Sequence, residues 1–259
     1  MIPHGSAGLK KPFTWFIDLL LNTSHVRPDK FFPATPNLTQ REESDFEFHF
    51  FISGGIGGKG GTYERRLDSV ECLDLSAPNG RWKQIASMST ARSSHTVEVL
   101  DGKLYVVGGG DGKEWLCTSE VYNPRKNKWS LIKNLRTKRW KCGLCVLNGY
   151  LYAIGGMDSP NAGFWGAPLK SVERYFPATD EWSEVSEMNE ARFGSAVSAY
   201  QGRIYVSGGF GKEKCILGST EVYDPDLDKW IKISPMNKMC GFVGGVLVDR
   251  PIHFEEGEC

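Results

Sequence analysis

Three arginines occupy the same position of a short pattern that recurs along the chain. Arg92, Arg139 and Arg192 each stand four residues after an apolar residue. A guanidinium is planar, and its N–H donors can pair bidentately with a carboxylate. That carboxylate can belong to a binding partner. It can also belong to a glutamate of the same domain, in which case the arginine braces its own sheet together with backbone carbonyls. The residues alone leave both interpretations open.

Aromatic side chains gather in the segments that follow four Gly-Gly pairs. These segments begin at Ile56, Gly110, Met157 and Phe210, and they contain Tyr63, Trp115, Phe164 and Trp165. An exposed aromatic ring near an arginine is a typical hot spot of a protein interface. Each ring could instead fold back over its own loop. Residues 158–168 favour binding, because long irregular loops are usually functional.

The residues that most often perform catalysis or hold metals do not form a site in this sequence. Cys142 and Cys145 have a redox or metal spacing, but on a predicted strand residues three apart point to opposite faces. A second such pair, which a zinc site would need, is missing. Two buried thiols are therefore expected. The five histidines show no ligand spacing. We predict no catalytic residue, no metal and no cofactor.

One glutamate recurs in every copy of the pattern, at Glu71, Glu120, Glu173 and Glu221. A catalytic carboxylate would occur once, so this rhythm indicates a structural role. The full pattern is a Gly-Gly pair, then Glu-x-(Tyr or Leu), then a single Trp. The pairs are Gly54-Gly55, Gly108-Gly109, Gly155-Gly156 and Gly208-Gly209, and the tryptophans are Trp82, Trp129, Trp182 and Trp230.

These elements repeat about every 50 residues, which is typical of a β-propeller. Asp101-Gly102, Asn148-Gly149 and Gln201-Gly202 predict tight hairpin turns. The strand after each turn is a nearly continuous apolar run, so neighbouring sheets should cover both its faces. We therefore predict an all-β propeller of four-stranded antiparallel blades, with each tryptophan wedged between neighbouring sheets.

The motifs resemble the Kelch repeat over roughly residues 47–248. The apolar-x-x-x-Arg steps that carry part of this resemblance are Met88 to Arg92, Leu135 to Arg139 and Met188 to Arg192. The most similar group is the BTB-Kelch (kelch-like) proteins. In that group the propeller recruits a substrate and the BTB part binds a cullin-type ubiquitin ligase. The resemblance implies a protein-binding module, plausibly a ubiquitin-ligase substrate adaptor.

The strand order also indicates where a partner binds. If the strands of each blade are lettered A to D outward from the axis, the D-to-A and B-to-C connections of antiparallel blades lie on one face, and these are the longer, chemically richer loops. The resemblance adds candidate residues. Matching arginines of the family can grip carboxylates of an acidic substrate peptide, and Ser93 matches a position that can bind substrate. The expected partner-binding residues are Arg92, Ser93, Trp115, Arg139, Trp140, Met157, Phe164, Trp165, Arg192 and Phe210.

Four motifs are recognisable, whereas relatives of this type more often have six blades. We expect an irregular leader over residues 1–46, too short for a BTB domain, then a partial propeller over 47–248 and a non-repeat tail over 249–259. The tail lacks the next strand, which suggests a truncated or alternatively spliced form. Residues 242–248 could close the ring beside residues 50–55. Otherwise strand edges would stay exposed.

Composition narrows the class of partner. The 31 basic and 31 acidic residues cancel, which argues against nucleic acid and anionic membrane. Seven scattered cysteines suit a reducing compartment, and no apolar run is long enough to span a bilayer, so a cytoplasmic protein is expected. A protein partner is predicted. The alternatives are actin binding, as in other Kelch proteins, and an enzyme such as a copper oxidase or sugar mutarotase. The enzyme ranks last because no His and Tyr cluster is found.

Overall fold

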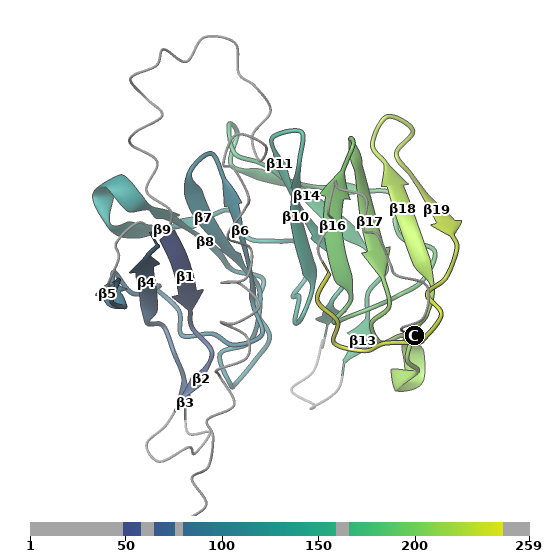
Figure 1. The fold of residues 1–259 in the computed structure, drawn as a ribbon. Coiled ribbons are helices and arrows are strands. Elements are labelled where there is room, and N and C mark those ends of the chain that lie inside the picture. The colour runs from purple at the N-terminus through teal and green to yellow at the C-terminus, as the bar shows by residue number, and fades with distance from the viewer. Residues whose placement is uncertain (1–48, 58–64, 76–79, 159–165, 246–259) are drawn as a thin grey trace, which may run out of the picture. The chain divides into compact units, whose positions relative to one another are not determined.

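The computed structural model describes residues 49–57, 65–75, 80–158 and 166–245. They belong to one unit of the chain, residues 48–259. Four antiparallel sheets follow one another along the chain (Figure 1). Two short ladders, β2 (Ile56–Gly57) with β3 (Arg65–Arg66) and β12 (Met157–Asp158) with β13 (Ala167–Pro168), lie in the B-to-C loops. In the described part of the chain no helix is long and apolar enough to cross a membrane.

The sheets are the blades that the repeat predicts, and their strands are lettered A to D in chain order. Blade 1 has three described strands, which correspond to B, C and D: β1 (His49–Ser53), β4 (Val70–Asp74) and β5 (Lys83–Ile85). Blade 2 has β6 (Thr96–Leu100), β7 (Lys103–Val107), β8 (Ser119–Asn123) and β9 (Lys128–Ile132), with the 3-10 helix η3 (Pro124–Lys126) between the last two. Blade 3 has β10 (Gly143–Leu147), β11 (Tyr150–Ile154), β14 (Val172–Phe176) and β15 (Glu181–Val185). Blade 4 has β16 (Ala196–Tyr200), β17 (Arg203–Ser207), β18 (Thr220–Asp224) and β19 (Lys229–Ile233), with η4 (Lys212–Lys214) before β18. The propeller architecture is confirmed.

The A-to-B hairpins have the geometry that their turn residues predict. In blade 2, Leu100 pairs with Lys103, which leaves Asp101 and Gly102 as a two-residue loop. Their φ angles are 50° and 65°. Positive φ at both central positions matches the right-handed twist of the flanking strands. The corresponding turns of blades 3 and 4 also have positive φ at both positions.

The core lies between neighbouring blades. Between blades 2 and 3, Tyr105 and Val107 pack against Leu151, Ala153 and other residues of blade 3. The second strand of blade 3 is buried from Leu151 to Ile154, as its continuous apolar run predicts. Burial on both faces of one strand requires a sheet on each side, which a row of blades provides.

Each tryptophan of blades 2 to 4 reaches the preceding blade, which confirms the predicted wedge for three of the four tryptophans. The prediction is wrong for Trp82, which is 40% exposed because no described blade precedes blade 1. The indole Nε1 of Trp129 donates to the Ala86 carbonyl at 2.8 Å, and that of Trp182 donates to the Lys133 carbonyl at 2.9 Å. Trp230 makes the same bond to Ser186 at 2.9 Å. Because the acceptor lies just after strand D of the previous blade, the bond fixes the position of one blade against the next.

Candidate functional site

The three arginines of the repeat lie at the start of blades 2, 3 and 4, and each is fully buried. Arg92 Nη2 donates to Glu120 Oε1 at 2.7 Å, and its Nη1 donates to the Gly108 carbonyl at 2.8 Å. Glu120 belongs to strand C of the same blade. The guanidinium therefore joins the end of strand B to strand C, as in the bracing interpretation.

Blades 3 and 4 repeat this geometry. Arg139 Nη2 pairs with Glu173 at 3.0 Å, and Arg192 Nη2 pairs with Glu221 at 2.7 Å. The carboxylate that each arginine binds belongs to its own blade, and the guanidinium is closed to solvent. This corrects the expectation that Arg92, Arg139 and Arg192 grip an acidic peptide, because a buried and paired guanidinium cannot reach one.

The repeating glutamates also hold the D-to-A loop. Glu173 accepts the amide N–H of Arg136 at 2.7 Å and that of Thr137 at 3.3 Å. Glu120 accepts two amides from Ser89 and Thr90, and Glu221 accepts those of Asn189 and Glu190. One buried carboxylate thus satisfies a guanidinium and two backbone donors. These recurring glutamates have a structural role in blades 2 to 4, as predicted.

A row of aromatic rings lies on the face formed by the D-to-A and B-to-C connections, hereafter the loop face. The aromatic row consists of Trp115, Trp140, Phe193, Phe210 and Phe242. Trp115 stacks on Trp140 at 5.7 Å between ring centroids, and Trp140 lies 6.2 Å from Phe193. Phe193 stacks on Phe210 at 5.3 Å, and Phe210 lies 4.5 Å from Phe242. The rings come from blades 2, 3 and 4 and from the segment after blade 4.

Backbone bridges position these rings. Each residue that follows a D-to-A arginine pairs with the B-to-C loop of its own blade, as Trp140 does with Met157 and Phe193 with Phe210. A glycine leaves space for one of the rings. A Cβ on Gly241 would lie 2.2 Å from the Phe210 ring, so a side chain at this position would displace that ring.

Lys141 supplies a cation beside the row. Its Nζ lies 3.6 Å from the Phe242 ring centroid and 4.5 Å from that of Trp140, both within cation–π range. Burial lowers the pKa of Lys141 below its ordinary value. Lys141 adopts a positive φ of 51°, as Ser94, Gly194 and Phe242 do at the corresponding positions.

The predicted site residues separate into three groups. Trp115, Trp140 and Phe210 are half-buried members of the row, whereas Ser93 and Met157 are buried beneath the loop face. Phe164 and Trp165 lie outside the described residues. Sequence reasoning missed Phe193, Phe242 and Lys141 as site residues. Phe193 occupies the repeat position of Trp140, and Phe242 occupies that of Lys141. The signal that could have identified them is therefore their position in the repeat.

Other reactive groups are buried, as Cys145 is, or half-buried, as Cys142 and His95 are. Burial raises the pKa of Cys142 to about 11 and also raises that of Cys145. His95 Nε2 is hydrogen-bonded to Ser53 Oγ of blade 1 at 2.9 Å, and burial lowers the pKa of His95 to about 4. No group of three or more His, Cys, Asp or Glu residues able to hold a metal occurs in the described ranges.

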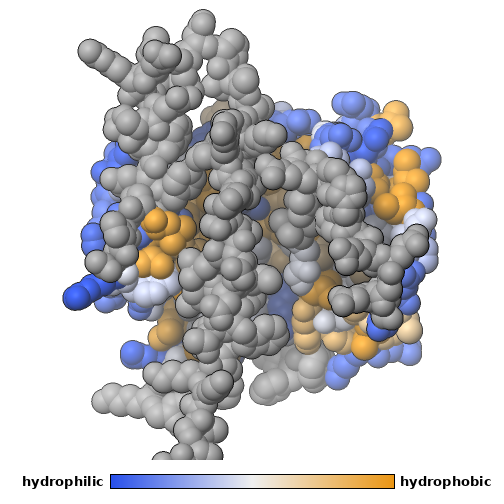
Figure 2. Space-filling view, viewed as in Figure 1, coloured by the Kyte–Doolittle hydropathy of each residue, from blue (hydrophilic) through white to orange (hydrophobic). Residues whose placement is uncertain are grey.

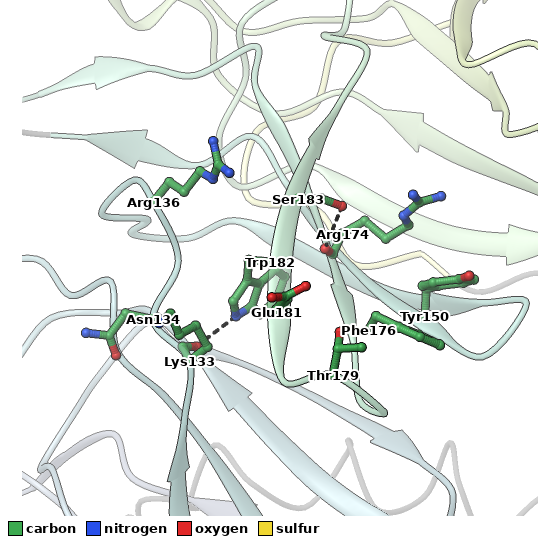
Figure 3. Close-up of a pocket in the computed structure, with 10 residues that line it drawn as sticks. All are labelled: Lys133, Asn134, Arg136, Tyr150, Arg174, Phe176, Thr179, Glu181, Trp182 and Ser183. Atoms are coloured by element: carbon green, nitrogen blue, oxygen red, sulfur yellow. Dashed lines mark hydrogen bonds between the residues drawn. The ribbon is translucent and has the colours of Figure 1, made fainter.

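A separate cavity of about 560 Å³ lies on the flank where blades 2 and 3 meet (Figure 3). Lys133 and Asn134 form one wall, and strands β14 and β15 form the other. Figure 3 shows the Trp182 indole bonded to the Lys133 carbonyl at this junction. Arg174 covers the Tyr150 ring at 4.7 Å in the same cavity. The cavity is thus part of the blade junction and shares no lining residue with the aromatic row.

Comparisons with known proteins agree with this architecture. The KLHDC2/KLHL20/DRC7 Kelch-repeats domain matches residues 47–209, and the Kelch motif matches residues 191–237. The chain is 33% identical over 164 residues to Kelch-like protein 26 of Mus musculus, covering 60% of this chain and 26% of that protein. It is 28% identical over 153 residues to Kelch-like protein 36 of Rattus norvegicus, covering 54% and 24%.

The chain therefore spans about a quarter of the length of these curated relatives. A solved structure described as "Structure of YjhT" superposes with a TM-score of 0.58 at 21% identity, covering 71% of this chain and 65% of the other. At that identity the superposition supports the fold alone. With the repeated Glu–Arg pairs and tryptophan bonds, the family matches lead to one conclusion: this chain belongs to the Kelch-repeat family and folds as Kelch β-propeller blades.

Proposed function

We propose that this chain is a protein-interaction module that captures a segment of a partner protein on its loop face. The observation that carries the proposal is the continuous aromatic row, which joins three blades and ends at Phe242, 55% exposed. Aromatic side chains supply large contact areas at interfaces and are enriched in hot spots. The proposed module extends over residues 47–248 of a cytoplasmic protein, between a leader of 46 residues and a tail over 249–259.

The chemistry of the row favours an apolar or aromatic segment of the partner. Arg92, Arg139 and Arg192 are neutralised inside their blades, and among the described residues Lys141 is the cation in contact with the row. We therefore expect binding to depend on apolar burial and to weaken only slightly as salt rises.

The Kelch-like relatives support a more specific role. We propose that the module is the substrate-recognition part of a cullin-RING ubiquitin ligase adaptor, in which a BTB part, on this protein or on another, would contact the ligase. Actin binding is the alternative. It would use outer blade surfaces and would not depend on the aromatic row.

The test compares proteins captured from cell lysate by the wild-type chain and by three variants. Trp140→Ala and Phe242→Ala should each weaken capture of the same set of proteins about 30-fold, since loss of a hot-spot ring costs about 2 kcal/mol. Leu131→Ala, on the exposed outer strand of blade 2, is the matched control and should leave capture unchanged.

Cosedimentation with filamentous actin separates the two functions. Binding to actin that persists in both row variants would favour the alternative. Capture that survives both substitutions would refute a role for the aromatic row in partner binding. An adaptor contacts the ligase independently of its substrate. If the row variants lose cullin together with the substrate, the adaptor assignment is contradicted.

A further inference from the structure

The three junctions between the described blades use one set of contacts. The tryptophan of the later blade donates its indole N–H to the carbonyl just after strand D of the earlier blade. The glutamate of the later blade accepts two amides from the earlier blade's D-to-A loop. Each junction therefore has two halves, the tryptophan and glutamate of the later blade and the D-to-A loop of the earlier one. Among the described residues, the first half on blade 1 and the second half after blade 4 have no such partner, and we call them unused.

The unused half on blade 1 carries exposed apolar groups. Ile52 pairs with Glu71 across the β1–β4 ladder, so both side chains lie on one face of the sheet. Phe50 and Trp82, 5.5 Å apart between ring centroids, lie beside them. Trp82 is 40% exposed, whereas Trp182 is 5% exposed. Figure 2 shows hydrophobic surface over the region of β1. We call these four residues the blade 1 free face.

The unused half after blade 4 already has the backbone hydrogen bonds of a D-to-A loop. The amide of Met236 donates to the Gly218 carbonyl at 2.8 Å, as Met188 donates to Lys170 before blade 4. The amide of Cys240 donates to the Leu217 carbonyl, as Arg192 donates to Leu169. Phe242 has the same positive φ as Lys141. Residues 234–242 are thus folded to receive a following blade.

The face of blade 4 that a following blade would cover has a matching residue. Tyr105 and Tyr152 each point toward the next blade, where they contact Tyr175 and Tyr223 at about 6 Å. Tyr205 holds the corresponding position on β17, and it is only partly buried. At an equivalent junction its ring would contact Leu73, which pairs with Phe50 on the blade 1 free face.

We propose that the blade 1 free face of one copy of this chain docks onto residues 234–242 and β17 of a second copy. In this contact Trp82 donates to the Ser234 carbonyl, and Glu71 accepts the amides of Asn237 and Lys238. The occupant is a second copy because the docking surface continues the junction geometry already present three times. The interface is heterologous, so two copies that make it twice close a ring of eight blades. Eight blades lie within the usual size of propellers.

One residue makes the proposed junction weaker than the internal ones. Cys240 occupies the backbone position of Arg92, Arg139 and Arg192. Glu71 of the first copy would therefore receive two amides from the second copy but no guanidinium. This predicts reversible association that Cys240→Arg should strengthen, because a charge-assisted pair would be restored.

Sedimentation equilibrium of the full chain over a range of concentrations tests the proposal. We expect a monomer–dimer equilibrium, abolished by Ile52→Lys and unchanged by the matched control Leu131→Lys on blade 2. Cys240→Arg should tighten association about tenfold, a change of about 1.4 kcal/mol. Glu71→Ala in the same chain should remove that gain.

The gain-of-association variant keeps the test informative if Ile52→Lys misfolds. A monomer at every concentration for both the wild type and Cys240→Arg would overturn the proposal. So would a tightening that survives Glu71→Ala. The Cys240→Arg variant could also stay monomeric and melt at a higher temperature that does not depend on concentration. That result would mean that the chain closes on itself, and it would overturn pairing between copies.

Discussion

Blades 1 and 3 carry the same sequence motif, but their motif residues have different surroundings. Glu173 is fully buried between Arg139 and two backbone amides, whereas Glu71 is exposed. Trp182 is buried against the end of blade 2, whereas Trp82 is 40% exposed. Blade 3 has a described blade on either side, and blade 1 has one only on its C-terminal side. The motif therefore encodes one half of a contact, and the neighbouring blade determines whether that contact forms.

The largest expected difference between the two blades concerns the glutamates. Glu173→Gln should destabilise the protein by about 3–5 kcal/mol, because it leaves the buried Arg139 charge uncompensated. Glu71→Gln should change stability by less than about 0.5 kcal/mol, as exposed substitutions usually do. Urea denaturation of both variants at high dilution, where association between copies is minimal, measures the contrast. Equal losses would mean that blade 1 is packed as blade 3 is.

The tryptophans should give a smaller contrast in the same direction. Trp182→Phe should cost about 2–3 kcal/mol, since it leaves the Lys133 carbonyl without its donor and opens space in the core. Trp82→Phe should cost much less in the dilute protein. Thermal melting of the two variants beside the wild type provides the measurement. A larger loss for Trp82→Phe would contradict the proposed role of the preceding blade.

The smallest of the three effects concerns acid and the junction between blades 1 and 2. His95 has a folded pKa of about 4 against an ordinary value of 6.5, chiefly because of burial and secondarily because of the nearby Arg92 charge. The unfolded chain therefore binds more protons between these values, and stability falls as the pH drops from 6.5 toward 4. From pH 7 to pH 5 the loss should be on the order of 2 kcal/mol.

Hydrogen exchange at pH 7 and pH 5 can locate that loss. The amides of β1 should lose protection more than those of β11, because His95 bonds to Ser53 at the end of β1. His95→Gln removes the titrating group and should make the exchange of β1 less dependent on pH. If the variant keeps the full pH dependence, other groups cause it.

The elements of this fold were predictable from sequence because their signals are local. Asp101-Gly102 fixes a turn between adjacent residues, and the continuous apolar run from Leu151 to Ile154 reports burial on both faces. The wedge role of Trp129 also followed from its regular spacing. The exposure of Trp82 did not, because it depends on the blade beside it and not on its own repeat.

The site was only partly predictable, because its contacts join distant segments. Arg92 and Glu120 are 28 residues apart, and the sequence could not show whether the arginine pairs with Glu120 or with a partner's carboxylate. Phe242 joins the aromatic row through Phe210, which belongs to a different loop. Trp140 was predicted because it directly follows one of the repeated arginines.

Besides its arginine, each buried glutamate holds the D-to-A loop through two backbone amides. Glu120, Glu173 and Glu221 each accept N–H groups, which every residue except proline provides. Apart from the arginines and Asn189, whose side chains also bond to these glutamates, the loop residues that donate these amides can change their side chains without losing these bonds. Mutation can remodel the binding surface of such a protein while the scaffold keeps its stability, so new partners can be acquired in small steps.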